Sequence, residues 1–248
     1  MKLDGKIAFV AGGASGIGLA TAAAFVQAGA IVYIADINAT AGEAAAADLG
    51  KSGKTVIFVQ VDITSQDAVN KARDAVVAAH GGTDILVVAA GWSSIQPFID
   101  TTPELWQKLI DLNYVGTLRL TQAFLPSMRA RGRGKIVNVA SDAGRAGSGG
   151  EAVYSGAKGA VIAFTKALAR EQARYLINVN CVCPGPTDTP LLASTPEKHR
   201  EALVKAIPFR RFAKPSEVAD AILFFASSRS DYLTGQVLSV SGGLTMLD

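Results

Sequence analysis

Cysteine and histidine are scarce in this chain, and their positions argue against a disulfide framework and a zinc site. The 248 residues include two cysteines and two histidines. Cys181 and Cys183 are one residue apart in an apolar run, where a strand would point both thiols to the same face, an arrangement that does not make a disulfide framework. Neither His80 nor His199 lies near a cysteine or a carboxylate cluster in the sequence. We therefore expect two buried free thiols, no metal and a reducing, cytoplasmic compartment.

Long apolar runs and a strong excess of one charge are also missing. No apolar run approaches the roughly 18 residues that a membrane-spanning helix needs. The N-terminus, Met-Lys-Leu-Asp-Gly-Lys, leads into an expected strand without the apolar segment of a secretory signal. The net charge of +3 is small and dispersed. We therefore expect neither a membrane nor a nucleic acid as a partner.

The chain does contain 49% apolar and 18% charged residues, which is typical of a globular protein with a large core. Short apolar runs alternate with segments of helical periodicity. The expected strands cover residues 6–11, 31–36, 55–61, 84–89, 135–140, 177–182 and 236–240. Because parallel strands need helical crossovers, this alternation predicts a single Rossmann-type α/β domain over residues 1–248. Its doubly wound parallel sheet would have about seven strands, with helices on both faces.

Two long segments in the second half of the chain connect expected strands. Thr102 followed by Pro103 predicts a helix start, and this helix would run to about Arg131. The stretch from Pro184 to Phe212 is predicted to be irregular, with one short helix. In doubly wound sheets ligands bind beyond the carboxyl ends of the strands, so the site is expected there.

A glycine-rich turn follows the first expected strand, where the sequence from Ala11 to Gly18 reads Ala-Gly-Gly-Ala-Ser-Gly-Ile-Gly. Glycines there let the backbone approach a pyrophosphate, and the next helix offers amide donors and a positive dipole. Asp36 ends the second strand eighteen residues after Gly18, where an acid can accept hydrogen bonds from ribose hydroxyls. An acid also repels a 2′-phosphate, and neither Ile37 nor Ser15 offers a basic partner. The pattern therefore favours NAD(H) over NADP(H).

Two further strand ends allow more than one interpretation. Asp62, at the end of the third strand, can bond the adenine amino group or cap the following helix. The run from Val88 to Gly91 is built of small residues, which suits either a close approach to a cofactor or a tightly packed strand end.

Tyr154 and Lys158 are four residues apart, so on a helix they share one face. An ammonium roughly 4 Å from the phenol would lower its pKa from about 10 towards the range where a general acid/base works at neutral pH. Alone, a Tyr-x-x-x-Lys pattern is more often an ordinary surface pair. The nucleotide-binding pattern upstream favours the catalytic interpretation.

Taken in order, these features resemble the motif set of the short-chain dehydrogenase/reductase family over the full length of the chain. The resemblance rests on Gly12, Gly16, Gly18, Asp62, Asn113, Ser141, Tyr154, Lys158, Pro184-Gly185, Thr234-Gly235-Gln236 and Gly242-Gly243. It implies an NAD(H)-dependent oxidoreductase that interconverts a secondary alcohol and a ketone. Residues 1–91 would mainly bind the cofactor, and residues 92–248 would mainly carry catalysis and substrate binding, with a lid at about 187–212.

The resemblance also implies residue roles. Tyr154 would be the acid or base, and Lys158 would lower its pKa and hold the nicotinamide ribose. Ser141 would bond the substrate oxygen where charge develops, and Asn113 would hold a water linked to Lys158 or, alternatively, only kink its helix.

The predicted contact residues form two sets. The cofactor set is Gly12, Ser15, Gly16, Ile17, Gly18, Asp36, Ile37, Asp62, Ile63, Ala89, Ala90, Gly91, Tyr154, Lys158, Pro184, Gly185, Thr187 and Thr189. The substrate-pocket set is Trp92, Gln96, Asp142, Ala143, Glu151 and Leu191. Trp92 fits a core or interface position equally well.

The chain departs from the family pattern at Ala11, where threonine is usual, and at Val88 and Ala89, where asparagines are usual; this puts cofactor contacts at Ala89 in doubt. Several segments after Ser141 are similar to dehydrogenases of 2-hydroxycyclohexane-carbonyl-CoA, which implies a cyclic 2-hydroxyacyl-CoA as one candidate substrate. The predicted lid also carries a basic cluster that fits either a phosphate contact or a solvated helix face. It comprises Lys198, Arg200, Lys205, Arg210 and Arg211.

Two alternatives stay open. The chain is also similar to 3-oxoacyl-carrier-protein reductases, although those commonly use NADPH, which Asp36 disfavours. A non-catalytic NAD-binding regulatory protein is the alternative of another class, and the intact Asn113, Ser141, Tyr154 and Lys158 argue against it. The family resemblance implies a homo-oligomer, a tetramer or a dimer, with the helices over 103–131 and 152–175 at the interface.

Overall fold

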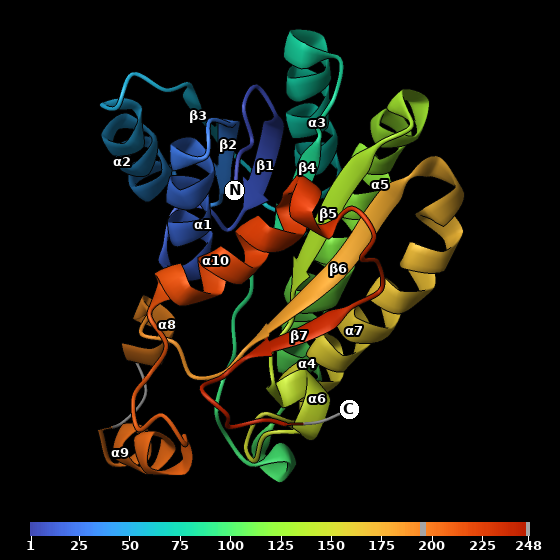
Figure 1. The fold of residues 1–248 in the computed structure, drawn as a ribbon. Coiled ribbons are helices and arrows are strands. Elements are labelled where there is room, and N and C mark those ends of the chain that lie inside the picture. Colours follow the sequence, from blue (N-terminus) through green and yellow to red (C-terminus); the bar gives the residue numbers. More distant parts are fainter. Residues whose placement is uncertain (194–196, 247–248) are drawn as a thin grey trace.

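The computed structural model describes residues 1–193 and 197–246, without the side chains of Lys198 and His199. Its centre is a seven-stranded parallel sheet with the order β3-β2-β1-β4-β5-β6-β7 (Figure 1). The strands are β1 (Ile7–Ala11), β2 (Ile31–Asp36), β3 (Val56–Gln60), β4 (Ile85–Val88), β5 (Gly134–Val139), β6 (Ile177–Pro184) and β7 (Val237–Val240). The predicted fold class is confirmed, and the order reverses between β1 and β4, where doubly wound folds bind ligands.

Helices cover both faces of the sheet, and each face encloses a separate apolar core (Figure 1). The helices are α1 (Gly16–Gln27), α2 (Ala39–Gly50), α3 (Gln66–His80), α4 (Pro103–Ile110), α5 (Gly116–Arg131), α6 (Ala143–Ala146), α7 (Ala152–Gln172), α8 (Pro190–Ala193), α9 (Glu197–Ala206) and α10 (Pro215–Ala226). Helices α1, α2 and α10 bury their apolar residues against one face, and α3, α5 and α7 against the other. The central strands are therefore apolar on both sides, which explains their continuous apolar runs.

Local sequence signals set several helix ends. The side chains of Asn38, Ser65 and Thr102 accept hydrogen bonds from backbone amides at the starts of α2, α3 and α4. Gly81 and Gly132 end α3 and α5 in the left-handed conformation, with φ of 71° and 60°. Of these signals, the Thr102 cap is the one from which a helix start was predicted above, and that start is confirmed.

The prediction of one continuous helix from Pro103 to Arg131 is wrong, because a π-helical segment over Asp111–Val115 interrupts it. The amide of Gly116 donates to the carbonyl of Asp111, five residues back, so the chain holds one extra residue in that turn. Asn113 lies in this segment with its side chain buried, and its amide donates to the carbonyl of Leu109 at 3.0 Å. The extra residue turns Asn113 inward, towards the ends of the strands.

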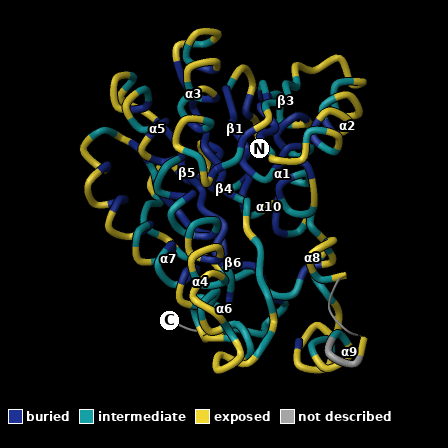
Figure 2. The backbone as a smooth tube through the Cα atoms, turned by 180° about the vertical axis from the view of Figure 1, so that it is seen from behind, coloured by how far each residue is buried: buried dark blue, intermediate teal, exposed yellow. Residues whose placement is uncertain are grey.

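The segment after β6 is also more regular than expected, because it contains two helices, α8 and α9, rather than one. Both lie at the same end of the molecule as α6 in Figures 1 and 2. Since α6 follows β5 and α8 follows β6, this end is the carboxyl edge of the sheet. Among residues 1–193 and 197–246, no helix combines the length and apolar character needed to cross a membrane.

The two cysteines lie side by side on β6. Both thiols are free and buried, and their sulfur atoms are 3.9 Å apart. The prediction of buried free thiols on one face of a strand is confirmed.

Candidate active site

The glycine-rich turn after β1 packs against the end of β4 so closely that its glycines are required. A Cβ on Gly12 would lie 2.6 Å from the backbone nitrogen of Ala90, and Gly12 also has a φ of 76°. A Cβ on Gly18 would lie 1.9 Å from the carbonyl oxygen of Gly12. The Ser15 side chain makes no capping hydrogen bond to any described residue. The amides at the start of α1 therefore face the site with their positive dipole, as an anion-binding site requires.

A cleft of about 590 Å³ opens along this turn and the ends of β1, β2 and β4. Its size falls within the range of small-molecule and cofactor sites. It is lined by most of the predicted cofactor residues, namely Gly12, Ser15, Gly16, Ile17, Gly18, Asp36, Ile37, Asp62, Ile63, Ala89, Ala90, Gly91 and Thr189. Tyr154, Lys158, Pro184, Gly185 and Thr187, also predicted to contact the cofactor, lie outside this lining.

Two carboxylates face the cleft with different partners. Asp36 accepts hydrogen bonds from the amides of Ala14 and Asn38, both at 3.1 Å, so the glycine-rich turn and the end of β2 hold its side chain in place. Asp62 accepts from the amide and hydroxyl of Thr64 at 2.8 and 2.7 Å. Ser65, not Asp62, caps α3. The helix-capping interpretation of Asp62 is therefore corrected, and its carboxylate lies on the wall of the cleft.

The four predicted catalytic residues come together next to Gly91, at one end of the cleft. A Cβ on Gly91 would lie 2.8 Å from Oδ1 of Asn113 and 3.1 Å from Nζ of Lys158. On α7, Nζ of Lys158 lies 5.8 Å from the centre of the Tyr154 ring, and it donates to the carbonyl of Val139 at 3.0 Å. Tyr154 is hydrogen-bonded with Ser141, which directly follows β5 and Ala140. A phenol, a hydroxyl and a buried ammonium thus meet at the edge of a dinucleotide-sized cleft.

Asn113 also fixes the backbone that follows β4. Its side-chain amide donates to the carbonyl of Trp92 at 2.8 Å, and its oxygen accepts from the amide of Trp92 at 3.3 Å. The π-helical turn is therefore part of the site, because it directs Asn113 at the segment between the cleft and Tyr154.

Comparison with known proteins decides the family. A family model described as "Enoyl-(Acyl carrier protein) reductase" matches residues 12–245. The chain belongs to the short-chain dehydrogenase/reductase family. Its relatives are named as reductases and dehydrogenases, and the chain is an oxidoreductase of this family.

Three similar proteins illustrate the range of this short-chain dehydrogenase/reductase group. The chain is 39% identical to the 3-oxoacyl-[acyl-carrier-protein] reductase of Thermotoga maritima, over 99% of this chain and 100% of that protein. It is 37% identical to the cis-4-hydroxycyclohexanecarboxylate dehydrogenase of Sinomonas cyclohexanicum, over 97% and 96%. The crystal structure of gox2181 matches with a TM-score of 0.96 and 33% identity, over 98% of this chain and 96% of that one.

The acid–base properties of this short-chain dehydrogenase/reductase site differ from expectation. Burial raises the pKa of Tyr154 to about 12, against the opposing effect of the hydrogen bond with Ser141, and the charge of Glu151 raises it further. Burial also lowers the pKa of Lys158 to about 8. The expectation that Lys158 brings the pKa of Tyr154 towards neutrality is corrected. The ammonium is itself desolvated and bonded to a carbonyl, so the loss of water around the phenol dominates.

On the substrate side the residues line a small, partly open cavity of only about 10 Å³. Of the predicted pocket residues, Gln96 and Glu151 line it. Leu191 instead lines the cofactor cleft, and Asp142 is buried and turned towards β7, where its carboxylate accepts from Ser239. These two residues therefore lie elsewhere than expected.

The other two predicted pocket residues border the site. Ala143 starts α6, and its amide donates to Oγ of Ser141 at 3.1 Å. Trp92 is half-buried, and Nζ of Lys108 lies 4.5 Å from the centre of its ring. The ring of Trp92 therefore faces the cation of Lys108.

Sequence reasoning missed several lining residues. In the cofactor cleft they are Ala35, Val61, Thr64, Lys108, Asp111, Leu112 and Pro190, and in the substrate cavity Ser94, Phe98, Thr101, Leu105, Leu109, Ala152 and Val153. Helical spacing would have grouped Leu105 with Leu109 and Lys108 with Leu112. The pattern could not show which of these faces meets a ligand.

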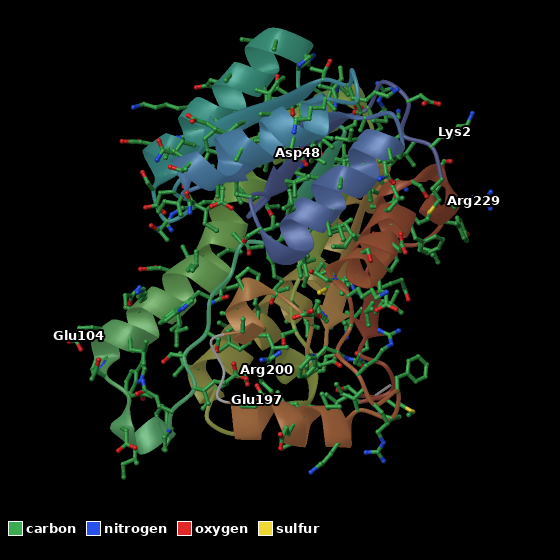
Figure 3. All side chains as sticks on the ribbon, turned by 90° about the vertical axis from the view of Figure 1, so that its left-hand side faces the viewer. Lys2, Asp48, Glu104, Glu197, Arg200 and Arg229 are labelled. Carbon is green, nitrogen blue, oxygen red and sulfur yellow. The ribbon has the colours of Figure 1, made fainter. Side chains whose placement is uncertain are left out.

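Two of the four members of the basic cluster whose side chains are described, Arg200 and Arg211, are paired with carboxylates. Arg200 pairs with Glu197 on α9 at 3.2 Å (Figure 3). Arg211 binds both oxygens of Glu217, at 2.6 and 2.7 Å, and Lys198 lies outside the described side chains. Paired charges favour the solvated-face interpretation over a phosphate site.

Proposed function

We propose that the protein interconverts a secondary alcohol and a ketone with NAD(H), using Tyr154 as the proton donor and acceptor. The observation that supports this most is the meeting of Asn113, Ser141, Tyr154 and Lys158 at Gly91, which also lines the cofactor cleft. The cleft fits a dinucleotide for two reasons. The glycine-rich turn after β1 could not keep its shape with a Cβ at Gly18, and the start of α1 offers its amides to a pyrophosphate. When bound, the nicotinamide supplies or accepts the hydride.

The protein's own groups would handle the proton. Ser141 and Tyr154, already hydrogen-bonded to each other, would both bond the substrate oxygen, which holds it where negative charge develops. Lys158 would hold positive charge behind Tyr154, and Asn113 would fix the backbone of Trp92 beside the reacting groups. With a pKa of about 12, the phenol of Tyr154 is neutral near pH 7, which is the form that protonates a nascent alkoxide. Ketone reduction therefore needs no prior ionisation, whereas alcohol oxidation needs the phenolate and should accelerate as pH rises.

We propose NAD(H) rather than NADP(H) because the Asp36 carboxylate faces the cleft. Two amides hold it there, and its neighbour Ile37 is apolar and 63% exposed. Among the described side chains, Lys108 is the one basic group in the lining, and it lies over Trp92 on α4 rather than beside β2. A 2′-phosphate near Asp36 would therefore meet an acid without a compensating cation.

Steady-state kinetics test this cofactor preference. We expect wild type to have the higher kcat/KM with NAD(H), and Asp36→Asn to shift the ratio towards NADP(H) by about tenfold or more, since it removes the repelling charge. Asp48→Asn is the matched control, because Asp48 is an exposed acid on α2 outside the cleft (Figure 3). A higher kcat/KM of wild type with NADP(H) would contradict the proposal.

Two substrate classes are proposed for the same chemistry: a cyclic 2-hydroxyacyl-CoA and a 3-oxoacyl thioester. The second is supported by the similarity to carrier-protein reductases. A panel of cyclic 2-hydroxyacyl-CoA, 3-oxoacyl thioester, aryl carbinol and simple cyclic alcohol substrates distinguishes them by kcat/KM. Equal, negligible turnover by wild type and Tyr154→Phe on the whole panel would instead favour the non-catalytic NAD-binding alternative.

We also propose a homotetramer. Exposed residues recur along one side of α5 and of α7 (Figure 2). On α7, Ala167 is exposed and would allow a close approach of a second chain, whereas Ala157 is buried within this one. Light scattering at micromolar concentration should give four times the 25.6 kDa chain mass, and a monomeric mass would refute this assembly.

A further inference from the structure

The cavity beside Tyr154 has an unusual charge pattern. Its lining consists of Ser94, Gln96, Phe98, Thr101, Leu105, Leu109, Glu151, Ala152, Val153 and Tyr154. Among these described residues, Glu151 has the one carboxyl side chain, and the phenol of Tyr154, whose pKa is raised to about 12, is neutral near pH 7. The space in which a substrate would react is therefore lined by apolar and uncharged polar groups, with one carboxylate among them.

The contacts of Glu151 do not neutralise that charge. Oε2 accepts from the hydroxyl of Ser148 at 2.7 Å, and Oε1 accepts from the hydroxyl of Ser93. Both donors are uncharged, so neither contact supplies a cation to the carboxylate, and two of its lone pairs are occupied. Its remaining lone pairs can accept a hydrogen bond from a neutral substrate.

The cations near the site have other partners. Nζ of Lys158 donates to the carbonyl of Val139, and a guanidinium nitrogen of Arg145 donates to Ser239 on β7 at 2.8 Å. Lys108 lies over Trp92 and lines the cofactor cleft, not this cavity. The negative field of Glu151 does reach the reacting group, because it raises the pKa of Tyr154, which also faces Ser141 and Cys183.

As it stands, the space of about 10 Å³ holds little more than one water, so a substrate would have to displace part of its wall. Two contacts join that wall to the opposite side: the amide of Gln96 donates to the carbonyl of Gly150 at 2.9 Å, and the hydroxyl of Ser93 donates to Glu151. When the segment holding Ser93 and Gln96 moves away, Glu151 loses one hydroxyl and keeps Ser148, three residues before it. Its charge is then directed at the entering substrate.

We propose that Glu151 makes the enzyme select substrates that carry no negative charge close to the reacting carbon. This inference rests on the proposed function and refines its substrate class. Uncharged cyclic alcohols and ketones fit, and so do thioesters, whose phosphates lie far from the reacting carbonyl. A small ring that bears a free carboxylate would place two negative charges in one cavity, where like charges repel strongly because little solvent separates them.

The test uses a matched pair of probes, cis-4-hydroxycyclohexanecarboxylate and its carboxamide, which differ in charge and little in shape. We expect wild type to favour the carboxamide by about tenfold or more in kcat/KM. Glu151→Gln keeps the shape and both serine contacts, and it should reduce this preference to within a few-fold, mainly by raising kcat/KM for the carboxylate. Glu104→Gln, which removes an outward-pointing acid at the start of α4, should leave the preference as in wild type (Figure 3).

A second measurement covers the case in which Glu151→Gln does not fold. The inhibition constants of cyclohexanecarboxamide and cyclohexanecarboxylate are then compared with wild type, using whichever panel substrate turns over. Weaker inhibition by the carboxylate, by about tenfold or more, supports charge selection; equal inhibition overturns it. An unchanged preference in a folded Glu151→Gln that binds the dinucleotide normally also overturns it. An absence of turnover on every alcohol and ketone overturns the proposed function itself and this inference with it.

Discussion

The cofactor cleft and the substrate cavity lie side by side but are built in different ways. The cleft, at about 590 Å³, is formed by strand ends and by a glycine turn packed on β4, so backbone atoms set most of its shape. The cavity, at about 10 Å³, is lined by side chains and narrowed by contacts between two loops. A cleft fixed by the sheet can serve one cofactor throughout a family, while loops can be changed without disturbing the sheet. The difference places cofactor binding in the frame of the fold and substrate choice in its most variable parts.

Tyr154→Phe should have the largest effect, because it should reduce catalysis strongly while leaving cofactor binding nearly unchanged. The variant removes the proton donor and leaves the cleft lining untouched. We expect kcat to fall by about 10²–10⁴-fold, the usual contribution of general acid/base catalysis. Dinucleotide binding, followed by fluorescence titration, should change by less than about threefold. If the dissociation constant rises as much as kcat falls, the two regions are not independent.

Gly18→Ala should do the opposite. Its Cβ would lie 1.9 Å from the carbonyl oxygen of Gly12, so the glycine turn must shift away from the cleft. We expect the dissociation constant of NAD(H) to rise by about tenfold or more, because the turn positions the amides that hold the pyrophosphate. Gly50→Ala on α2 is the control, since nothing lies within 4 Å of its added Cβ. Tight dinucleotide binding by a folded Gly18→Ala would show that the turn does not hold the cofactor.

Lys158 lies where the two regions meet, and its substitution should change the stability of the fold as well as catalysis. Burial lowers its pKa from 10.5 to about 8, so the folded state binds this proton less tightly than the unfolded state does. Between about pH 8 and pH 10.5 the side chain is protonated more fully in the unfolded chain than in the folded one. Across this range the contribution of Lys158 to the free energy of unfolding of wild type therefore rises with pH. Below about pH 8 the buried charge costs stability.

Lys158→Met should therefore raise the free energy of unfolding near neutral pH, by on the order of 1–3 kcal/mol, while abolishing catalysis. Urea unfolding at about pH 7 and about pH 10 measures this, and the gain should be smaller at the higher pH. A variant that is less stable than wild type at both pH values would show that the bond from Lys158 to Val139 outweighs the cost of burial.

The parts of the site that could be predicted are those on regular elements. Gly12, Gly18 and Asp36 follow from the spacing between a strand, a turn and the next strand, and all three line the cleft. Tyr154 and Lys158 follow from helical spacing. In each case a short stretch of sequence determines the geometry, because the elements themselves are regular.

The parts that could not be predicted depend on packing between distant segments. Ser93 and Glu151 meet across 58 residues of sequence, and no local pattern pairs them. The raised pKa of Tyr154 follows from burial, which only the assembled fold determines. The π-helical turn at Asn113 shifts one hydrogen bond from four to five residues, a change without a residue signature of its own.

The π-helical turn at Asn113 also bears on which insertions and deletions the chain can accept. The segment Asp111–Val115 holds one residue more than an α-helix would. Deleting one residue there would give an unbroken helix and rotate α4 by about 100° relative to α5, which would carry Leu105 and Leu109 away from the cavity. We therefore expect single-residue insertions and deletions, which loops accept readily, to be much less tolerated between Pro103 and Arg131.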